Sequence, residues 1–458
     1  SSFAIDGETV VAATVDIDNS GTINISGGEL ESTGKLDHDG NLTMSNGTLD
    51  INGEYESESS ATESITGGTI TCAGEWDGDG DDAFTPTGGT VVFDGNTDII
   101  LRFHTSSNFY NLTISNTSGD VHPYNTVDVD GDLTISSGAD LDIDYQAENI
   151  TIGGSFLMSG TLTTSGETIT FDGTGTTTCG AYSNAGMVMY ISKSSGSVTT
   201  TGDISLDELR VTSGTMIVDG ETVAVDDQLV ISGGTLKITS GIVQNTSSSS
   251  DKTTISGGTV DVDGGELRIG DLASDYSADL NMSSGTLDIS GGTVNICDEL
   301  DVADGTINVS GGTLNIGAYT GSSNSSSDYD RFEMDAGTLS LTGGTVNVMG
   351  QENVTDKDAL DLDGAVSVTQ TSSNTFNITD GGGSSDENMY IRLGGNTIDN
   401  ITTSNTGNTV YARDAITAAT LNVSDGTLEL QANSTISSNI DVDGTLAISS
   451  TTFTATGS

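Results

Sequence analysis

One short motif recurs along this chain and constrains its fold more than any other feature. The motif is Ser-Gly-Gly-Thr followed by alternating apolar and polar residues. Its clearest copies begin at Ser232, Ser256, Ser290 and Ser310, and looser copies begin at Thr66, Thr87, Thr342 and Asp425. Most neighbouring copies in the regular stretch lie 20 to 32 residues apart. This period, together with the lack of any helical apolar pattern, is typical of a solenoid built from strands.

The residues after each motif indicate how a strand would face. In the copy at Ser256, Val260 and Val262 alternate with polar residues, so both valines should point to one side of a strand. Glycine pairs or Asp-Gly then end the strand, and glycine supplies the positive φ that a corner requires. The many glycines, 61 in all, are therefore expected at turns of a coil rather than in a ligand-binding loop.

These patterns predict an all-β fold, a single elongated parallel β-helix (β-solenoid) of right hand, with about 20 coils of 20–30 residues. No six-residue apolar repeat favours the left-handed type. We expect one continuous domain over residues 1–458. Related blocks within it span roughly 87–165, 166–240 and 370–450, and the most regular repeats span 230–350.

Charge excludes several classes of partner. The chain carries 67 acidic and 11 basic side chains, a formal net charge of −56. Nucleic-acid binding depends on Lys and Arg displacing counterions, and anionic membrane surfaces repel such a chain. The chain has no run of eighteen apolar residues, so we expect no segment that spans a membrane. The strand-like start at Phe3, without a basic and apolar leader, fits a mature secreted chain that is extracellular or at the cell surface.

Two kinds of string suggest a family likeness. They are the repeated "GTLxIsgGTVnV" type and the blocks that run from Phe109-Tyr-Asn-Leu-Thr-Ile to Leu133-Thr-Ile-Ser-Ser-Gly. They resemble secreted, adhesin-like β-helix exoproteins of prokaryotic cell surfaces, such as autotransporter passengers and filamentous-haemagglutinin-like proteins. The resemblance implies a surface or extracellular rod and carries over no catalytic residue.

Carboxylates dominate the candidate chemistry. Pairs of the form Asp-x-Asp-Gly place two carboxylates about 7 Å apart on one strand face, and stacked pairs offer the oxygens that Ca²⁺ takes. The pairs are Asp37/Asp39, Asp128/Asp130, Asp261/Asp263, Asp361/Asp363 and Asp441/Asp443, and the densest run holds Asp77, Asp79 and Asp81. The alternative is a solvated acidic face without bound metal, and the sequence leaves both open.

Other constellations are weaker. Asn96-Thr97-Asp98 matches one tripeptide that is typical of β-helix polysaccharide hydrolases, but the other strings typical of those enzymes are absent. The chain also has no cluster of basic residues that would bind uronates. We therefore expect no enzyme. Trp76 with Tyr110, Tyr124 and Tyr145 forms a candidate sugar-stacking patch, against the alternative that these rings fill the core or loops. The three histidines (His38, His104 and His122) are isolated in sequence. His104 and His122 are expected in loops, against the alternative that they meet in space. The three cysteines (Cys72, Cys179 and Cys297) are expected as small core or turn residues.

Sequons suggest glycosylation. About fifteen Asn-x-Ser/Thr strings occur, and several fall at polar positions within expected strands. The acceptor candidates are Asn24, Asn41, Asn111, Asn149, Asn281, Asn308, Asn353, Asn377, Asn400 and Asn433. Many such strings arise by chance in a chain this rich in Asn, Ser and Thr.

Three functions remain as hypotheses. The segments Phe3–Val15 and Thr445–Thr456 look like strands without caps, which predicts pairing of the chain with itself, head to tail, in an extracellular filament, sheath or surface layer. Its acidic face would be hydrated or bridged by Ca²⁺. The second hypothesis is a monomeric adhesin stalk that binds cell-surface glycans, and the third is a polysaccharide-active enzyme.

Overall fold

The structure is a computed structural model of the whole chain. It describes residues 2–78, 83–184, 186–247, 252–272, 278–318, 332–350, 358–371, 374–380, 388–449 and 451–456. The chain divides into two compact units, Ser1–Asp207 and Glu208–Ser458, with β26 (Ile204–Val218) running through the division. The expectation of one continuous domain stays a prediction.

The first unit contains only strands and turns among its described residues. Its strands are β1 (Ser2–Ile5), β2 (Thr9–Ala12), β3 (Val15–Ile17), β4 (Thr22–Ile25), β5 (Glu29–Ser32), β6 (Leu36–His38), β7 (Asn41–Met44), β8 (Thr48–Ile51), β9 (Tyr55–Ser57), β10 (Thr62–Cys72), β11 (Trp76–Gly78), β12 (Gly88–Phe93), β13 (Ile99–Phe103), β14 (Asn111–Ile114), β15 (Asp120–Pro123), β16 (Val127–Val129), β17 (Leu133–Ile135), β18 (Asp140–Asp142), β19 (Ile150–Ile152), β20 (Phe156–Met158), β21 (Thr161–Thr163), β22 (Thr168–Phe171), β23 (Thr177–Cys179), β24 (Tyr182–Ser183) and β25 (Val188–Thr200).

The second unit is built in the same way. Its strands are β27 (Thr222–Ile231), β28 (Thr235–Ile238), β29 (Ile242–Asn245), β30 (Thr253–Val262), β31 (Glu266–Ile269), β32 (Leu280–Ile289), β33 (Thr293–Ile296), β34 (Leu300–Val302), β35 (Thr306–Val309), β36 (Thr313–Ile316), β37 (Phe332–Met334), β38 (Ala336–Leu341), β39 (Thr345–Gly350), β40 (Leu360–Asp361), β41 (Ala365–Gln370), β42 (Thr375–Asp380), β43 (Met389–Arg392), β44 (Asn400–Ala412), β45 (Thr417–Leu430), β46 (Ser434–Val442), β47 (Thr445–Ile448) and β48 (Phe453–Ala455).

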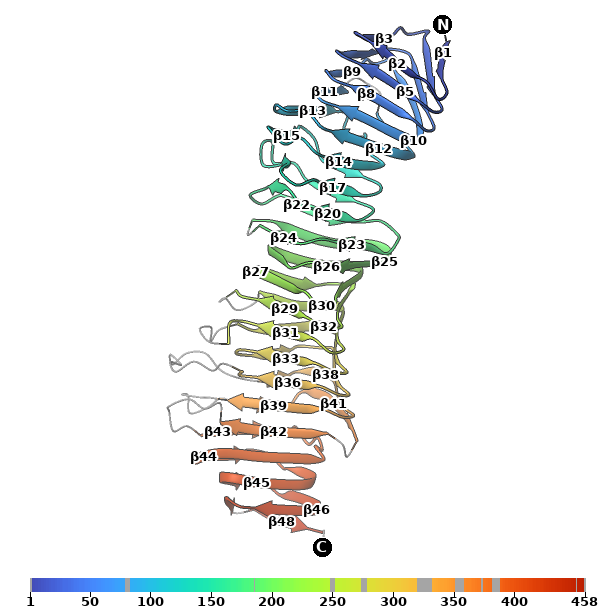
Figure 1. Cartoon of the computed structure of the whole chain (residues 1–458). Helices are drawn as coiled ribbons and strands as arrows, with labels where there is room; N and C mark the ends of the chain where they lie inside the picture. The colour runs from blue at the N-terminus through green and yellow to red at the C-terminus, as the bar shows by residue number, and fades with distance from the viewer. Residues whose placement is uncertain are drawn as a thin grey trace. The chain divides into compact units, whose positions relative to one another are not determined.

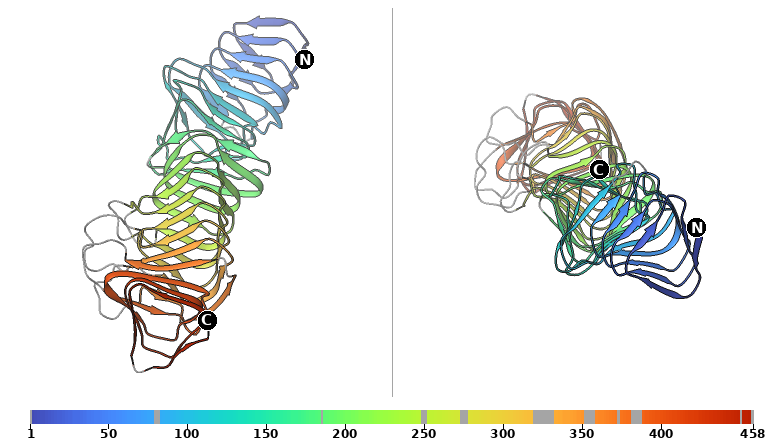
Figure 2. Two further views of the ribbon diagram at one scale, coloured as in Figure 1. Left: turned by 60° about the horizontal axis from the view of Figure 1, so that its bottom comes forward. Right: turned by 90° about the horizontal axis from the view of Figure 1, so that it is seen from above.

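Within each unit, every coil pairs in parallel with the coil before and after it (Figures 1 and 2). Paired residues lie from 18 positions apart, as in Thr427 and Thr445, to 32 apart, as in Thr313 and Thr345. The chain makes about 19 turns. The predicted all-β parallel solenoid is therefore confirmed, while its hand stays a prediction. Among the described residues, no helix has the length and apolar character of a membrane span.

Alternation along the strands places the core inside the coils. Val260 and Val262 are buried while Asp261 between them is half-buried, as the sequence predicts. Their partners in the next coil, Leu287 and Ile289, are buried as well. Each interior row therefore repeats Val, Leu or Ile from coil to coil at the strand spacing of about 4.8 Å. Dispersion contacts along these rows hold the coils together.

Aromatic rings widen the core of the first unit. Trp76 is fully buried, stacks on Tyr55 at 4.0 Å between ring centroids, and meets Phe93 edge-on at 5.7 Å. Of the two alternatives for Trp76, the core position is therefore confirmed and the sugar-stacking patch is excluded for that residue, because burial of so large an apolar ring is favourable. The three cysteines are buried and free, as predicted. Burial raises the pKa of the Cys72 and Cys179 thiols to about 12.

The second glycine of the repeat has a steric role. Gly258, Gly292, Gly312 and Gly344 all have positive φ, between +56° and +68°. A Cβ on any of them would lie 2.2 or 2.3 Å from a glycine carbonyl oxygen of the preceding coil. Two requirements coincide here: a left-handed backbone and close approach of two coils. The prediction that glycine forms the corners is confirmed at these positions.

This pair of requirements can be separated by substitution. We expect Gly312→Ala to destabilise the second unit by clearly more than the ~1–2 kcal/mol of left-handed strain alone. Gly407→Ala is the matched control, because Gly407 has φ +79° but no atom within 4 Å of an added Cβ. Urea unfolding followed by circular dichroism measures both. Equal losses of stability in the two variants would contradict the proposed clash between coils.

Candidate functional site

Polar side chains form rows on the outer face of one sheet of the first unit. This eight-stranded sheet has the order β21-β18-β15-β13-β11-β9-β6-β3. Its parallel register places Asp16, Asp37, Glu56 and Asp77 opposite one another on β3, β6, β9 and β11. Lys35 forms ion pairs with Glu56 and, at 3.7 Å, with Asp37. Like charges in register repel, so such a row favours any cation placed beside it.

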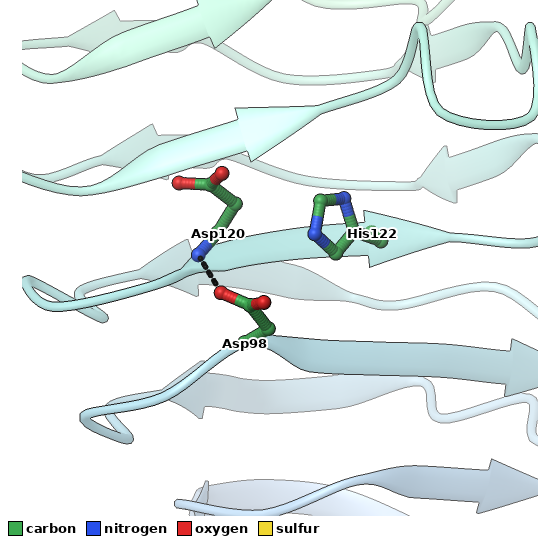
Figure 3. A group of neighbouring side chains, drawn as sticks. All are labelled: Asp98, Asp120 and His122. Carbon is green, nitrogen blue, oxygen red and sulfur yellow. Dashed lines mark hydrogen bonds between the residues drawn. The ribbon is translucent and has the colours of Figure 1, made fainter.

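A second group on this sheet combines carboxylates with a histidine. Asp120 and His122 occupy alternate positions of β15 and so share its outer face. Asp98, just before β13, lies beside Asp120 and accepts a hydrogen bond from the Asp120 backbone N–H at 3.3 Å (Figure 3). One ligand atom from each of the three side chains lies within 4.8 Å of the others.

The next strand adds two more carboxylates to this group. Asp140 on β18 pairs with Asp120, and Asp142 brings its Oδ2 to 3.2 Å from His122 Nδ1. His122 is only 9% exposed. Within the described part of the chain, Asp98, Asp120, Asp140 and Asp142 form no ion pair with Lys or Arg. The group therefore concentrates negative charge without a protein cation of its own.

Aromatic rings border the same group. Tyr145 lies over His122 with 4.5 Å between ring centroids and 5.8 Å from the ring of Tyr124. The Arg102 guanidinium lies 5.1 Å from the centre of the Tyr124 ring and forms an ion pair with Glu75. Hydrogen bonding with Tyr124 raises the pKa of the Tyr145 hydroxyl. Two of the four rings predicted for a sugar-binding patch are thus neighbours, with Tyr145 half exposed.

Crowding of carboxylates changes their ionisation. Burial raises the pKa of Asp140, and the nearby charges of Asp120 and Asp142 add to the rise against hydrogen bonds from Thr163. Burial also raises the pKa of Asp128, with further contributions from Asp130 and Asp172. Each raised pKa means that the folded state takes up a proton more readily than a free aspartate does.

Three of the predicted calcium pairs already face protein cations, the first being Asp37/Asp39 through the ion pair between Asp37 and Lys35. Lys237 forms ion pairs with Asp261, at 2.6 Å, and with Asp263. These hydrogen bonds raise the pKa of Lys237, and the bond from Lys237 lowers that of Asp263. Arg392 lies 3.0 Å from Asp363, whose backbone N–H donates to Asp361 Oδ1 at 3.0 Å. Calcium binding by these pairs stays a prediction.

The other predicted pairs lie apart from basic groups or outside the described residues. Asp130 accepts a hydrogen bond from the Asn108 amide. Asp441 lies on β46 and Asp443 directly follows it, and both are exposed. Asp77 lies on β11, whereas Asp79 and Asp81 lie outside the described residues. Asp39 accepts a hydrogen bond from Ser60 Oγ at 3.2 Å.

Several predicted glycan acceptors use their amide nitrogen in ladders between coils. Asn377 Nδ2 donates to Asn347 at 2.7 Å, and Asn308 Nδ2 donates to Asp288 at 2.9 Å. Nδ2 of Asn111, Asn400 and Asn41 also donates to a residue of a neighbouring coil. Asn24, Asn41, Asn149 and Asn433 are exposed, Asn281 is half-buried, and Asn353 lies outside the described residues. Glycosylation stays a prediction, and the exposed four are the more accessible acceptors.

The histidines were only partly predicted. His122 lies on β15 and is buried, so its placement in a loop is wrong, whereas His104 follows β13 outside any strand. His38, for which no position was predicted, lies on β6 and is buried. Asp98, Asp120 and Asp142 were missed as ligand candidates, because 22 residues separate members that meet only through the register. A signal existed: Asp120-x-His122 and Asp140-x-Asp142 are polar–apolar–polar strings with the same spacing along two strands.

Comparisons with protein-family models, with curated proteins and with solved structures found no match to this chain. The fold class is therefore established by the structure itself, a parallel β-solenoid. The narrower resemblance to adhesin-like exoproteins is supported by no relative.

The raised pKa of Asp140 predicts how stability depends on pH. A carboxyl whose pKa is higher in the folded state stabilises that state at low pH, and this contribution is lost as pH rises through the folded pKa. We expect Asp140→Asn to stabilise the first unit at pH 7, by less than about 1 kcal/mol because solvent screens the half-exposed group, and to have no effect near pH 3. Thermal unfolding across this range, in EDTA, measures the difference.

A control has the opposite sign. Hydrogen bonds from Ser240 and Thr239 lower the pKa of Asp219, so its contribution to stability is present at pH 7 and lost as pH falls through the folded pKa. Asp219→Asn should therefore destabilise the chain at pH 7 and not at pH 3. If Asp140→Asn lowers stability at pH 7, as Asp219→Asn is expected to do, the crowded carboxylates on β15 and β18 do not destabilise the folded state.

Proposed function

We propose that the chain is a structural subunit of an extracellular filament, sheath or surface layer, assembled by head-to-tail stacking of coils. The in-register ladders within each unit support this proposal. Because side chains repeat from coil to coil, a further coil stacked on the end would make the same contacts as the coils already present. The resemblance to secreted surface exoproteins supports the extracellular location, and the proposal assigns no catalytic residue.

The observation that carries the proposal is the exposure of two side chains that belong to core rows. Phe3 on β1 and Ile448 on β47 are each 47% exposed, although both occupy inward-facing rows. Their partners one coil further in, Ile23 and Leu430, are 9% and 1% exposed. Beside Phe3 lies a hollow of about 490 Å³ lined largely by apolar side chains of the first coils. One more coil would cover either residue, and the proposal is that a second copy of this chain can supply such a coil.

Electrostatics sets the conditions for assembly. Two copies that each carry a net charge of −56 repel one another, so apolar stacking alone is opposed at low ionic strength. Added salt screens this repulsion over about 10 Å at 0.1 M, and Ca²⁺ can bridge carboxylate rows on adjacent copies. Assembly should therefore depend on cations. Any glycans would be attached to exposed asparagines rather than to the stacking edges.

A second function is favoured by one observation. The neighbouring rings of Tyr124 and Tyr145, beside carboxylates that can accept hydroxyl hydrogen bonds, suit a carbohydrate ring. An adhesin stalk that binds cell-surface glycans is the alternative on this ground. Saturable glycan binding by the monomer that is lost in Tyr145→Ala would favour it over the filament.

Assembly is testable by electron microscopy of the purified chain with Ca²⁺ and then with EDTA. We expect uniform fibres with Ca²⁺ or 0.5 M NaCl, and fibre loss in EDTA at low salt if Ca²⁺ bridges the carboxylates. Phe3→Lys and Ile448→Lys should each abolish fibres, because a charge would be buried at the stacking face. Leu157→Lys is the control, since Leu157 is 45% exposed at the side of a coil within the first unit.

Two results would overturn the proposal. One is dispersed single particles under all these conditions, which would leave the adhesin stalk as the better account. The other is fibres that persist in both lysine variants but disappear in Leu157→Lys, which would place the contact on the sides of the coils.

A further inference from the structure

We propose that Asp98, Asp120 and His122 form a binding site for a zinc-type divalent cation, with Asp142 orienting the histidine. The site lies on the eight-stranded sheet of the first unit and is independent of filament assembly. Two of its side chains come from β15 and the third from Asp98, directly before β13, and their ligand atoms lie within 4.8 Å of one another. Zinc bonds to nitrogen and oxygen are about 2.0–2.2 Å long, so ligand atoms lie at most about 4 Å apart. Asp98 is exposed, so its side chain has room to rotate toward a bound cation.

The histidine distinguishes this group from a merely acidic surface. His122 is 9% exposed, yet its Nδ1 has no hydrogen-bond partner, although Asp142 Oδ2 lies 3.2 Å away. The other side of the ring faces the carboxylates of Asp98 and Asp120 (Figure 3). Buried polar atoms normally have a partner. A buried ring held between two sets of carboxylates, with no hydrogen bond at Nδ1, is therefore suited to binding a cation through its other nitrogen.

A cation explains both sides of the ring. Binding through Nε2 requires the neutral imidazole and fixes its proton on Nδ1. That proton then points to Asp142, and a small rotation about the side chain completes the hydrogen bond. A carboxylate that receives the second N–H of a metal-bound histidine is the usual arrangement, because it fixes the ring and raises its basicity.

Charge also favours this group over the predicted aspartate pairs. Asp261 and Asp263 have Lys237 beside them, and Asp363 has Arg392. In contrast, the four carboxylates around His122 form no ion pair with Lys or Arg in the part of the chain that the structure describes. A divalent cation would neutralise charge that no side chain compensates here.

The ligand set selects the kind of cation. Ca²⁺ takes six to eight oxygens and Mg²⁺ a near-octahedral oxygen shell, so neither makes use of an imidazole nitrogen. Zinc binds His and Asp readily in tetrahedral geometry, and imidazole also suits other late transition metals. Two carboxylates and one imidazole leave one tetrahedral position for water. We therefore assign the site to Zn²⁺ rather than to the Ca²⁺ expected elsewhere on the surface.

The test is calorimetric titration of the EDTA-treated full chain with Zn²⁺ in 0.5 M NaCl, where loosely held ions on the acidic surface are screened. We expect one site that binds Zn²⁺ at least 100-fold more tightly than Ca²⁺. His122→Gln and Asp98→Asn should each remove or severely weaken it. Asp142→Asn should weaken it 10- to 100-fold. His104→Gln is the histidine control and should leave binding unchanged, because His104 lies outside the group.

Substituted cobalt gives a second readout, since four-coordinate Co²⁺ absorbs far more strongly in the visible than hydrated Co²⁺. The band should appear in the wild-type chain and in His104→Gln but not in His122→Gln. Circular dichroism checks folding, and exposed Asp98→Asn keeps the test valid if His122→Gln does not fold. Zinc binding that is unchanged in both His122→Gln and Asp98→Asn, or that vanishes in 0.5 M NaCl, would overturn the assignment. Fibres that form in zinc-free buffer leave it untouched.

Discussion

Repetition of the backbone register from coil to coil is the constraint on which the rest of this structure depends. Parallel pairing places each strand residue about 4.8 Å from its equivalent in the next coil, and the register shifts at corners such as that between Ser256 and Thr259. In the interior this stacks valine on leucine and isoleucine on valine, which is favourable at every step. The corner glycines maintain the register, because at Gly312 or Gly344 any side chain would meet the backbone of the coil before it.

The same repetition is unfavourable for charges on the outer face. A row of aspartates repeated in register repels itself, and the chain limits this repulsion in several ways. Lys237 stands at one end of a row that continues through Asp261 and Asp288 to the amide of Asn308. In a parallel row Asn295, Asn315, Asn347 and Asn377 pass amide hydrogen bonds of 2.6–2.7 Å from coil to coil. An amide both donates and accepts, so it stacks on its own kind where a carboxylate cannot.

This contrast explains how much the sequence could predict. Val260 and Val262 lie in the core as expected, since alternation is a local property that needs no knowledge of neighbouring coils. The repeat also identified the solenoid and its corner glycines. By contrast, the environment of His122 depends on which residue lies opposite it one coil away. Coil lengths vary from 18 to 32 residues, so partners cannot be read from a constant offset. The choice between core and surface for Trp76 stayed open for a related reason: its core neighbours Phe93 and Phe109 come from later coils.

Sites on such a scaffold arise from coincidences between coils rather than from a motif within one. A metal-binding helix or loop brings its ligands together by their spacing within one short segment. Here Asp120 and His122 share β15, whereas Asp142 lies on the neighbouring strand β18 and Asp98 directly precedes β13, the neighbour on the other side. One residue inserted into either neighbouring coil would move its carboxylate to the interior face, because side chains alternate along a strand. Preserving the cation site therefore requires preserving three coil lengths, the same requirement that keeps the core rows in register.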